Sequence, residues 1–183
     1  MSEATDKIEK WFKDASEYNL STWDRLPEIY LYMDQVLTYM NKQLTPYEGS
    51  RTSGQLTSSM INNYVKDGVL ERPKQKKYAR EHLAVLTVIC MLKSVLSIQE
   101  ISTMLNIMAE TQEKEALYEK FIKAHTTAFQ EVGQRVLDTI NDGEAALNLL
   151  AVELSIEANA RRSAAEKILN ELSETRTVQK KKE

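Results

Sequence analysis

Apolar residues recur every three or four positions along most of the chain, which is the spacing of one face of an α-helix. The segment from Leu56 to Asn106 shows this pattern most clearly and organises the rest. It predicts a short helix from Thr57 to Asp67, a loop, an almost continuously apolar helix from His82 to Leu96, and a further helix from Ser97 onward. The central helix of the three is expected to be buried on most sides.

The short helix has well-marked ends. Thr57 is a suitable N-cap, Gly68 suits the left-handed residue just past the end, and Leu56 with Ile61 can form a hydrophobic staple. Its polar face carries Ser59, Asn62, Asn63 and Lys66. Asparagine can pair with adenine edges and lysine can reach a phosphate, so this face has the chemistry of a recognition helix. The plainer alternative is a solvated polar face.

The loop after Gly68 is basic. Pro73 interrupts any helix, and the flanking residues Val69, Leu70 and Tyr78 suit two short strands, which predicts a small β-hairpin with 74–77 at its tip. Residues 51–109 carry a net charge of +4, whereas 1–50 carry −4 and 110–175 carry −6. An acidic chain with one basic region suggests a polyanionic partner. A lysine-rich tip that serves solubility is the alternative.

The chain before this region predicts two helices. The first runs from Thr5 to Tyr18, is amphipathic, and has Thr5 as its expected cap. The second begins at Pro27 in its first turn and continues to about Gln43. The connection 45–55 is long for a compact helix-turn-helix. It is expected either to bring Arg51 to a phosphate or to be an insertion without contacts.

Beyond Asn106 the pattern becomes that of a helical hairpin. Apolar residues from Tyr118 to Ile140 repeat at three and four, as in a coiled-coil seam, and the helix should end near Gly143. A second seam extends from Leu147 to Leu172. Two such helices cannot bury all this apolar surface alone, so the hairpin is expected to pack either on another chain or on the first helix of the same chain.

Several positions in the central segment together resemble the DNA-binding domain of MerR-type regulators: Tyr64, Gly68-Val69-Leu70, Lys76-Lys77-Tyr78, Leu83, Leu86, Ile89, Leu96-Ser97-Ile98 and Glu100-Ile101. More closely, the stretch from Leu26 to Asn106 resembles a bacterial family called domain of unknown function 1836. Residues 60–64 and 76–78 carry that second likeness. The resemblance implies a mostly α fold: a MerR-like winged helix-turn-helix with a small β-hairpin wing, followed by a long C-terminal αα-hairpin.

The resemblance also implies a transcriptional regulator that binds double-stranded DNA as a homodimer. In that dimer the two C-terminal hairpins are expected to form a four-helix arrangement. The residues expected at the DNA are Ser59, Asn62, Asn63, Lys66, Arg72, Lys74, Lys76, Lys77, Tyr78 and Arg80. The chain departs from the MerR pattern at Asn62 and Asn63, where those regulators carry an Arg and a Tyr that hold phosphate. It also lacks their metal-sensing cysteines. A protein-interaction module that keeps the fold without binding DNA is the alternative function.

Composition narrows the remaining classes. The chain has 183 residues, a net charge of −3 and only five Gly and three Pro, which fits a globular, mostly helical protein. Its one cysteine, Cys90, lies in the most apolar helix and is expected to be a core residue. No export signal or membrane span is expected, which favours the cytoplasm. The expected divisions are an N-terminal helix (1–25), the winged domain (26–109), the hairpin (110–175) and a frayed basic tail (176–183).

Candidate chemistry is sparse. His125 interrupts an apolar seam without a second ligand nearby, so a packed histidine is a better interpretation than a metal ligand. His82, near a helix start, has no evident partner in the sequence. The chain shows no catalytic triad order, no glycine-rich phosphate loop and no paired cysteines. We therefore expect no enzyme activity, cofactor or metal, and the sequence identifies no small-molecule effector.

Overall fold

A computed structural model describes residues 3–17, 19–45 and 55–180. The chain is mostly helical, and the described residues contain no strand, so the expected all-α class is confirmed. The expected position of Arg51 lies outside the described residues. The helices are α1 (Glu3–Glu17), η1 (Trp23–Arg25), α2 (Met33–Leu44), α3 (Ser58–Lys66), α4 (Arg80–Leu92), α5 (Ile98–Ala109), α6 (Lys114–Thr139), η3 (Ile140–Asp142) and α7 (Glu144–Lys180).

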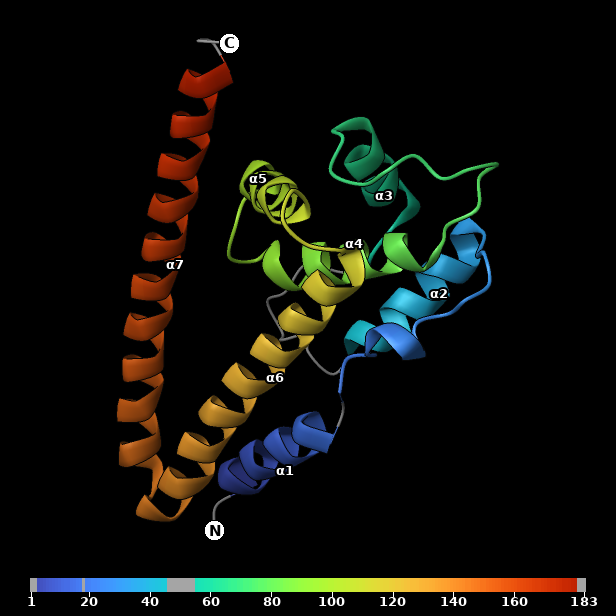
Figure 1. The fold of residues 1–183 in the computed structure, drawn as a ribbon. Helices are drawn as coiled ribbons and strands as arrows, with labels where there is room; N and C mark the ends of the chain where they lie inside the picture. The colour runs from blue at the N-terminus through green and yellow to red at the C-terminus, as the bar shows by residue number, and fades with distance from the viewer. Residues whose placement is uncertain (1–2, 18, 46–54, 181–183) are drawn as a thin grey trace.

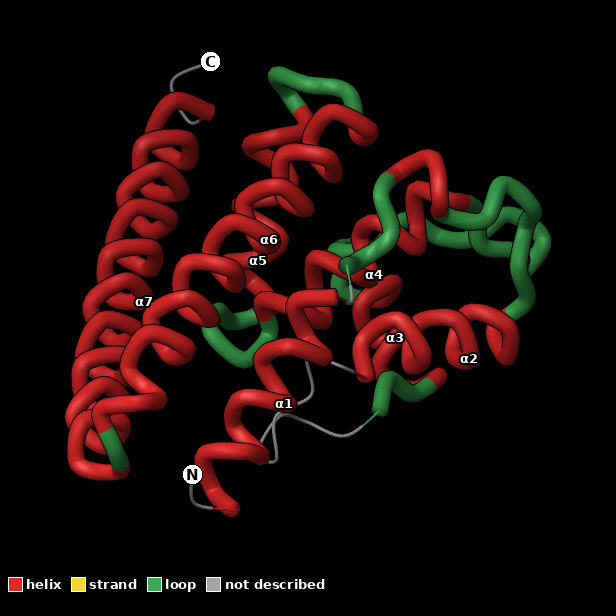
Figure 2. The backbone as a smooth tube through the Cα atoms, turned by 90° about the horizontal axis from the view of Figure 1, so that it is seen from below, coloured by secondary structure: helices red, strands yellow, loops and turns green. Residues whose placement is uncertain are grey.

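The helices form a cluster and a long hairpin (Figures 1 and 2). Helices α2 to α5 make the cluster, α6 runs from it toward the far end of the molecule, and α7 returns along α6. Helix α1 packs on α6 near that far end, and α7 contacts α5 on its way back. In both views α7 and the α2–α3 pair lie on opposite sides of the molecule.

The core of the cluster is built around α4, as its apolar sequence predicted. Leu83, Leu86 and Ile89 are completely buried. They share one apolar core with residues of every other helix in the cluster, including Val36, Met40, Ile61 and Ile101. Each such side chain stabilises the fold by about 1.5–3 kcal/mol relative to an exposed position. Thr87 is also buried, and its hydroxyl donates to the Leu83 carbonyl oxygen at 2.9 Å.

Helix α2 begins at Met33 and not at Pro27, so that prediction was wrong. The reason is a contact far along the chain. The Leu31 amide donates to the Tyr78 carbonyl at 2.9 Å, and the Tyr78 amide donates to the Leu31 carbonyl at 2.8 Å. This antiparallel pairing requires an extended backbone at Leu31, which prevents a helix from passing through it. Ile29 and Tyr30 lie outside the core, at 69% and 63% exposure.

Two other helix boundaries differ from expectation. Helix α1 begins at Glu3, so Thr5 is not its cap and is instead a buried residue within its first turns. Helix α4 runs from Arg80 to Leu92, and a turn then leads to Ser97. At Ser97 the predicted capping box is confirmed, because the Glu100 amide donates to Ser97 Oγ at 3.2 Å and the Ser97 amide donates to Glu100 Oε2 at 2.7 Å.

The first turns of α6 are attached to the cluster at several points. The Tyr118 hydroxyl donates to the Ser21 carbonyl at 2.8 Å, and the Trp23 amide donates to Glu119 Oε1 at 2.5 Å. The Tyr118 ring is buried, and desolvation raises the pKa of its hydroxyl well above the usual value. These contacts join η1 and α6, so the hairpin begins from a fixed position on the cluster.

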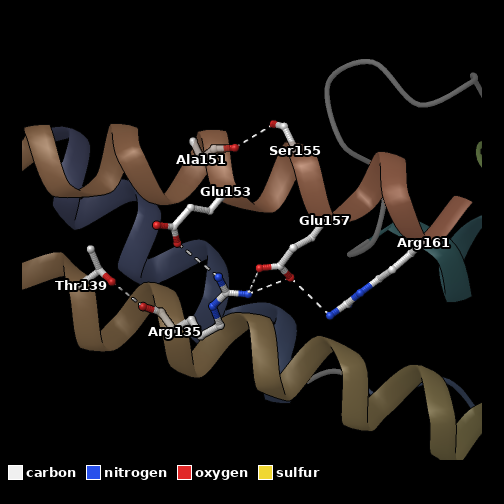
Figure 3. A network of polar contacts seen from close by, with 7 residues as sticks. All are labelled: Arg135, Thr139, Ala151, Glu153, Ser155, Glu157 and Arg161. Atoms are coloured by element: carbon white, nitrogen blue, oxygen red, sulfur yellow. Dashed lines mark hydrogen bonds and ion pairs between the residues drawn. The ribbon is translucent and has the colours of Figure 1, made fainter. Parts of the chain in front are cut away.

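The hairpin turns where the sequence predicted. Helix α6 ends at Thr139, a short 3-10 turn follows, and Gly143 adopts a φ of +90° that favours glycine. Arg135 on α6 then links the two helices. Its guanidinium donates to both carboxylate oxygens of Glu157 on α7, at 2.8 and 2.9 Å, and reaches Glu153 at 3.5 Å (Figure 3).

The end of α7 also differs from expectation. The helix continues to Lys180, so the first part of the predicted frayed tail is helical. Arg176 is held in place because its Nη1 donates to Glu110 Oε1 at 2.7 Å, next to the end of α5. Among the described residues, no helix is long and apolar enough to cross a membrane. The same residues contain no group of three or more side chains suited to a metal ion.

Candidate nucleic-acid interface

Helix α3 is fixed at both ends by its own sequence. At the start, Thr57 Oγ1 accepts a hydrogen bond from the Met60 amide at 3.3 Å, which confirms the predicted cap. At the end, Gly68 has a φ of +74°, its amide donates to Val65, and the Val69 amide donates to the Tyr64 carbonyl at 2.9 Å. This is a Schellman ending. The helix therefore presents a defined polar face to solvent.

The inner face of α3 belongs to the core. Ile61 is fully buried and Tyr64 is 6% exposed. The predicted polar face points outward, because Ser59, Asn62, Asn63 and Lys66 are all exposed. Within the part of the chain that the structure describes, the side chains of Asn62 and Asn63 form no hydrogen bond that would occupy them. Both amides are thus available to a partner.

The basic loop closes with a tight turn at the expected place. The Lys77 amide donates to the Lys74 carbonyl at 2.9 Å, and the two residues between them, Gln75 and Lys76, have φ values of 51° and 62°. Two left-handed residues in this position are the signature of a type I′ turn. Lys74 and Lys76 are exposed at its tip. Lys77 is half-buried, with its Nζ 5.5 Å from the centre of the Tyr32 ring.

The arms of this loop pair differently from the predicted hairpin. Tyr78 pairs with Leu31 and not with Val69 or Leu70. The amides of Val69 and Leu70 instead donate to the Tyr64 carbonyl and so complete the end of α3. The two-stranded hairpin is therefore absent from the described residues, and a turn attached to the start of α2 takes its place.

Two of the predicted DNA contacts, Tyr78 and Arg80, are engaged by other parts of the protein. The Tyr78 side chain is 3% exposed and belongs to the core. The Arg80 side chain is 18% exposed, pairs with Glu28 at 3.0 Å and lies 5.7 Å from the centre of the Trp23 ring. Neither side chain belongs to the exposed surface, so the structure gives no support to their assignment as DNA contacts.

The remaining cations of the predicted interface lie at the surface. Lys66, Arg72, Lys74 and Lys76 are exposed and form no ion pair within the described residues. Glu71, the acid nearest to them in the loop, is instead engaged by Lys114 of α6, with Nζ to Oε1 at 2.5 Å. That hydrogen bond lowers the pKa of the Glu71 carboxyl and keeps it ionised. We call Ser59, Asn62, Asn63, Lys66, Arg72, Lys74 and Lys76 the α3–turn surface.

His82 has a structural partner that the sequence did not reveal. Its Nδ1 accepts a hydrogen bond from the Ala79 amide at 3.0 Å, which caps α4, and its ring meets the Tyr78 ring edge-on at 5.5 Å between centres. A histidine three positions past a helix start was the available signal, because side chains there can reach back to the cap. His125 is packed as expected, between Phe121 and Phe129 with ring centres 6.3 Å away on each side.

The two histidines predict a loss of stability in mild acid. Burial lowers the pKa of both His82 and His125 below the usual value. As the pH falls, the unfolded chain therefore binds protons before the folded one does, and the free energy of unfolding should decrease between about pH 7 and 5. Urea titrations across this range measure the decrease. Replacing both residues, as His82→Gln with His125→Phe, should flatten the profile, and an unchanged slope would contradict the assignment.

The central part of the chain matches a known protein family. The family model described as Domain of unknown function (DUF1836) matches residues 21–123, which is more than half of the sequence. The chain belongs to the DUF1836 family. The DUF1836 match begins just before η1, includes α2 to α5, and ends within α6. No curated protein and no solved structure matches the chain.

Proposed function

We propose that this DUF1836 protein is a DNA-binding transcriptional regulator with a MerR-like helix-turn-helix. In this proposal α2 and α3 are the two helices of the motif, α3 enters the major groove, and the loop 69–79 is the wing. The observation that carries it is the α3–turn surface. A helix with fixed ends and a buried inner face exposes two unengaged asparagines, and this helix and the loop after it carry four exposed cations that form no ion pair within the described residues.

Each part of this surface has a distinct role in the proposal. Asn62 and Asn63 read base edges, because the asparagine amide pairs bidentately with adenine. Lys66, Arg72, Lys74 and Lys76 bind backbone phosphates and set the register on the duplex. Lys77 stays over the Tyr32 ring and attracts the phosphates electrostatically from a longer distance. The turn, with its left-handed backbone, lies at the edge of the cluster that faces away from α7 (Figure 1).

The proposal includes a homodimer. Helix α7 exposes Leu149, Val152 and Ile156, at 60%, 50% and 64%, and we call these three residues the α7 apolar patch. They lie at i, i+3 and i+7 and so share one face of the helix. That face is turned away from Leu150, which is buried. A second copy of the chain is the partner that best suits such a patch on a symmetric two-site DNA reader.

Selection of bound sequences from a random duplex pool, followed by fluorescence anisotropy at several salt concentrations, tests the proposal. We expect retention of a defined sequence, with a log-log salt slope of about −4 to −8 for a dimer. That slope corresponds to the release of counterions from the phosphates that the cations neutralise. Absence of duplex binding at low salt would overturn the regulator and favour a protein-interaction module that keeps the fold.

A further inference from the structure

Backbone pairing joins the basic loop to the segment that precedes α2. Leu31 pairs with Tyr78 through two hydrogen bonds, and Lys77 pairs with Lys74 across the turn. Side chains alternate between the two faces of an extended backbone, and residues directly opposite in an antiparallel pair share a face. Leu31 and Tyr78 face the core, at 6% and 3% exposure. The residues on either side of them in the chain therefore face solvent.

The outward face of this pairing places two tyrosines beside the lysines. Tyr30 and Tyr32 precede and follow Leu31, are 63% and 51% exposed, and are called the tyrosine pair below. Tyr32 lies opposite Lys77, whose Nζ is 5.5 Å from the centre of the tyrosine ring. Lys77 in turn lies opposite Lys74, which belongs to the α3–turn surface. The tyrosine pair therefore continues the α3–turn surface toward the start of α2.

The exposure of these two rings is unusual within the chain. The other tyrosines that the structure describes are buried or half-buried: Tyr39, Tyr64, Tyr78 and Tyr118. The hydroxyls of the tyrosine pair form no hydrogen bond with another described residue. Each hydroxyl is an uncharged group that can donate one hydrogen bond to a partner. Two such donors are thus available next to the exposed lysines of the turn.

The charges and the position of this surface suit a phosphate backbone. Lys74 and Lys77 supply positive charge on the same face, whereas the segment before α2 adds none, because its acid Glu28 pairs with Arg80 at 3.0 Å. Tyrosine hydroxyls are among the groups that hydrogen-bond phosphate oxygens in DNA complexes. The tyrosine pair also lies directly before α2, and the first helix of a helix-turn-helix crosses the backbone while the second enters the groove.

We infer that Tyr30 and Tyr32 belong to the duplex interface, where their hydroxyls donate hydrogen bonds to backbone phosphates beside the bases that α3 reads. This inference rests on the proposed function and extends its interface to the segment before α2. Contacts to phosphate fix the position of the protein on the duplex and carry no sequence information directly. The tyrosine pair therefore adds affinity for every duplex, and the choice of sequence stays with Asn62 and Asn63.

The test removes only the two hydroxyls. Tyr30→Phe with Tyr32→Phe keeps both rings, including the ring face under Lys77, so the turn should stay in place. We expect this double variant of the full-length protein to bind the selected duplex about five- to fiftyfold more weakly than wild type. Fluorescence anisotropy measures the affinity, and circular dichroism with thermal unfolding checks that the fold is unchanged.

Two further measurements identify the kind of contact that is lost. An uncharged donor releases no counterion, so the double variant should keep the log-log salt slope of wild type, whereas Lys76→Gln should make the slope shallower by about one. The double variant should also bind a scrambled duplex more weakly by the same factor, so the ratio of the two affinities is preserved. Asn62→Ala should instead lower that ratio, because it removes a base contact.

The control is Ile29→Ala, which shortens an exposed side chain of the same segment and should change duplex affinity by less than about twofold. If wild-type protein binds no duplex, the proposed function and this inference both fail. If wild type binds and the double variant matches it within about twofold, only this inference is wrong, and a protein partner would suit the tyrosine pair better. A salt slope that becomes shallower by one or more in the double variant would also overturn the inference, because displaced lysines would then explain the loss.

Discussion

Replacing Lys74, Lys76 and Lys77 together with Glu is expected to abolish duplex binding, with a loss of at least about a thousandfold at moderate salt. Each replacement removes a cation from the phosphate-facing turn and adds an anion that repels the same phosphates. The helices should be unaffected, because the turn is formed by the backbone bond between Lys77 and Lys74. Fluorescence anisotropy with the selected duplex measures the loss, and circular dichroism monitors helicity.

A matched variant distinguishes the effect of losing contacts at the turn from the effect of changing the net charge of the protein. Lys7, Lys10 and Lys13 of α1 are exposed and lie outside the α3–turn surface, so changing them to Glu alters the total charge by the same amount. Their ion pairs with Glu3 and Glu9 are at the surface and contribute little to stability. We expect this control to weaken binding by less than about tenfold. If both variants lost the same amount of duplex affinity, the turn would not be part of the DNA interface.

Introducing Glu at both Val152 and Ile156 is expected to convert a dimer into a monomer and to weaken duplex binding by more than about a hundredfold. Two charges in the centre of an apolar contact would remain unpaired and desolvated, which costs far more than the contact gains. Sedimentation equilibrium measures the mass of each variant. The affinity falls because a monomer loses the second half-site and the effective concentration that comes with it.

The matched control for this prediction is Gln130→Glu with Gln134→Glu. Both glutamines are exposed on α6, so the control adds the same two charges away from the α7 apolar patch. It should remain dimeric. If wild-type protein sediments as a monomer at micromolar concentration, the dimer part of the proposal is wrong. The DNA contacts of a single chain would still be open to test.

The parts of the fold that depend on residues close together in the sequence were predictable. Thr57 and Gly68 fix α3 through contacts within five residues of its ends, and Ser97 with Glu100 fixes α5 in the same way. Caps and turns of this kind are encoded locally, so the sequence contains the whole signal. Gly143 marks the hairpin turn for the same reason.

The parts that failed depend on residues far apart in the chain. Pro27 suited a helix start, but pairing between Leu31 and Tyr78 extends the backbone and delays α2. The sequence also did not reveal that Tyr78 belongs to the core or that Arg80 pairs with Glu28 beside Trp23, because both contacts are tertiary.

The attachment of α6 has a geometric consequence. The helix runs without interruption from Lys114, which holds Glu71, to Thr139 at the hairpin turn, a length of about 39 Å. Tyr118 and Glu119 in its first turns fix the helix to the cluster, so α6 acts as a stiff connection between the cluster and the hairpin turn. In a twofold-symmetric dimer, α6 would set both the distance and the rotational phase between the two α3–turn surfaces. The operator is then expected to tolerate base changes more readily than a half-turn insertion between its repeats.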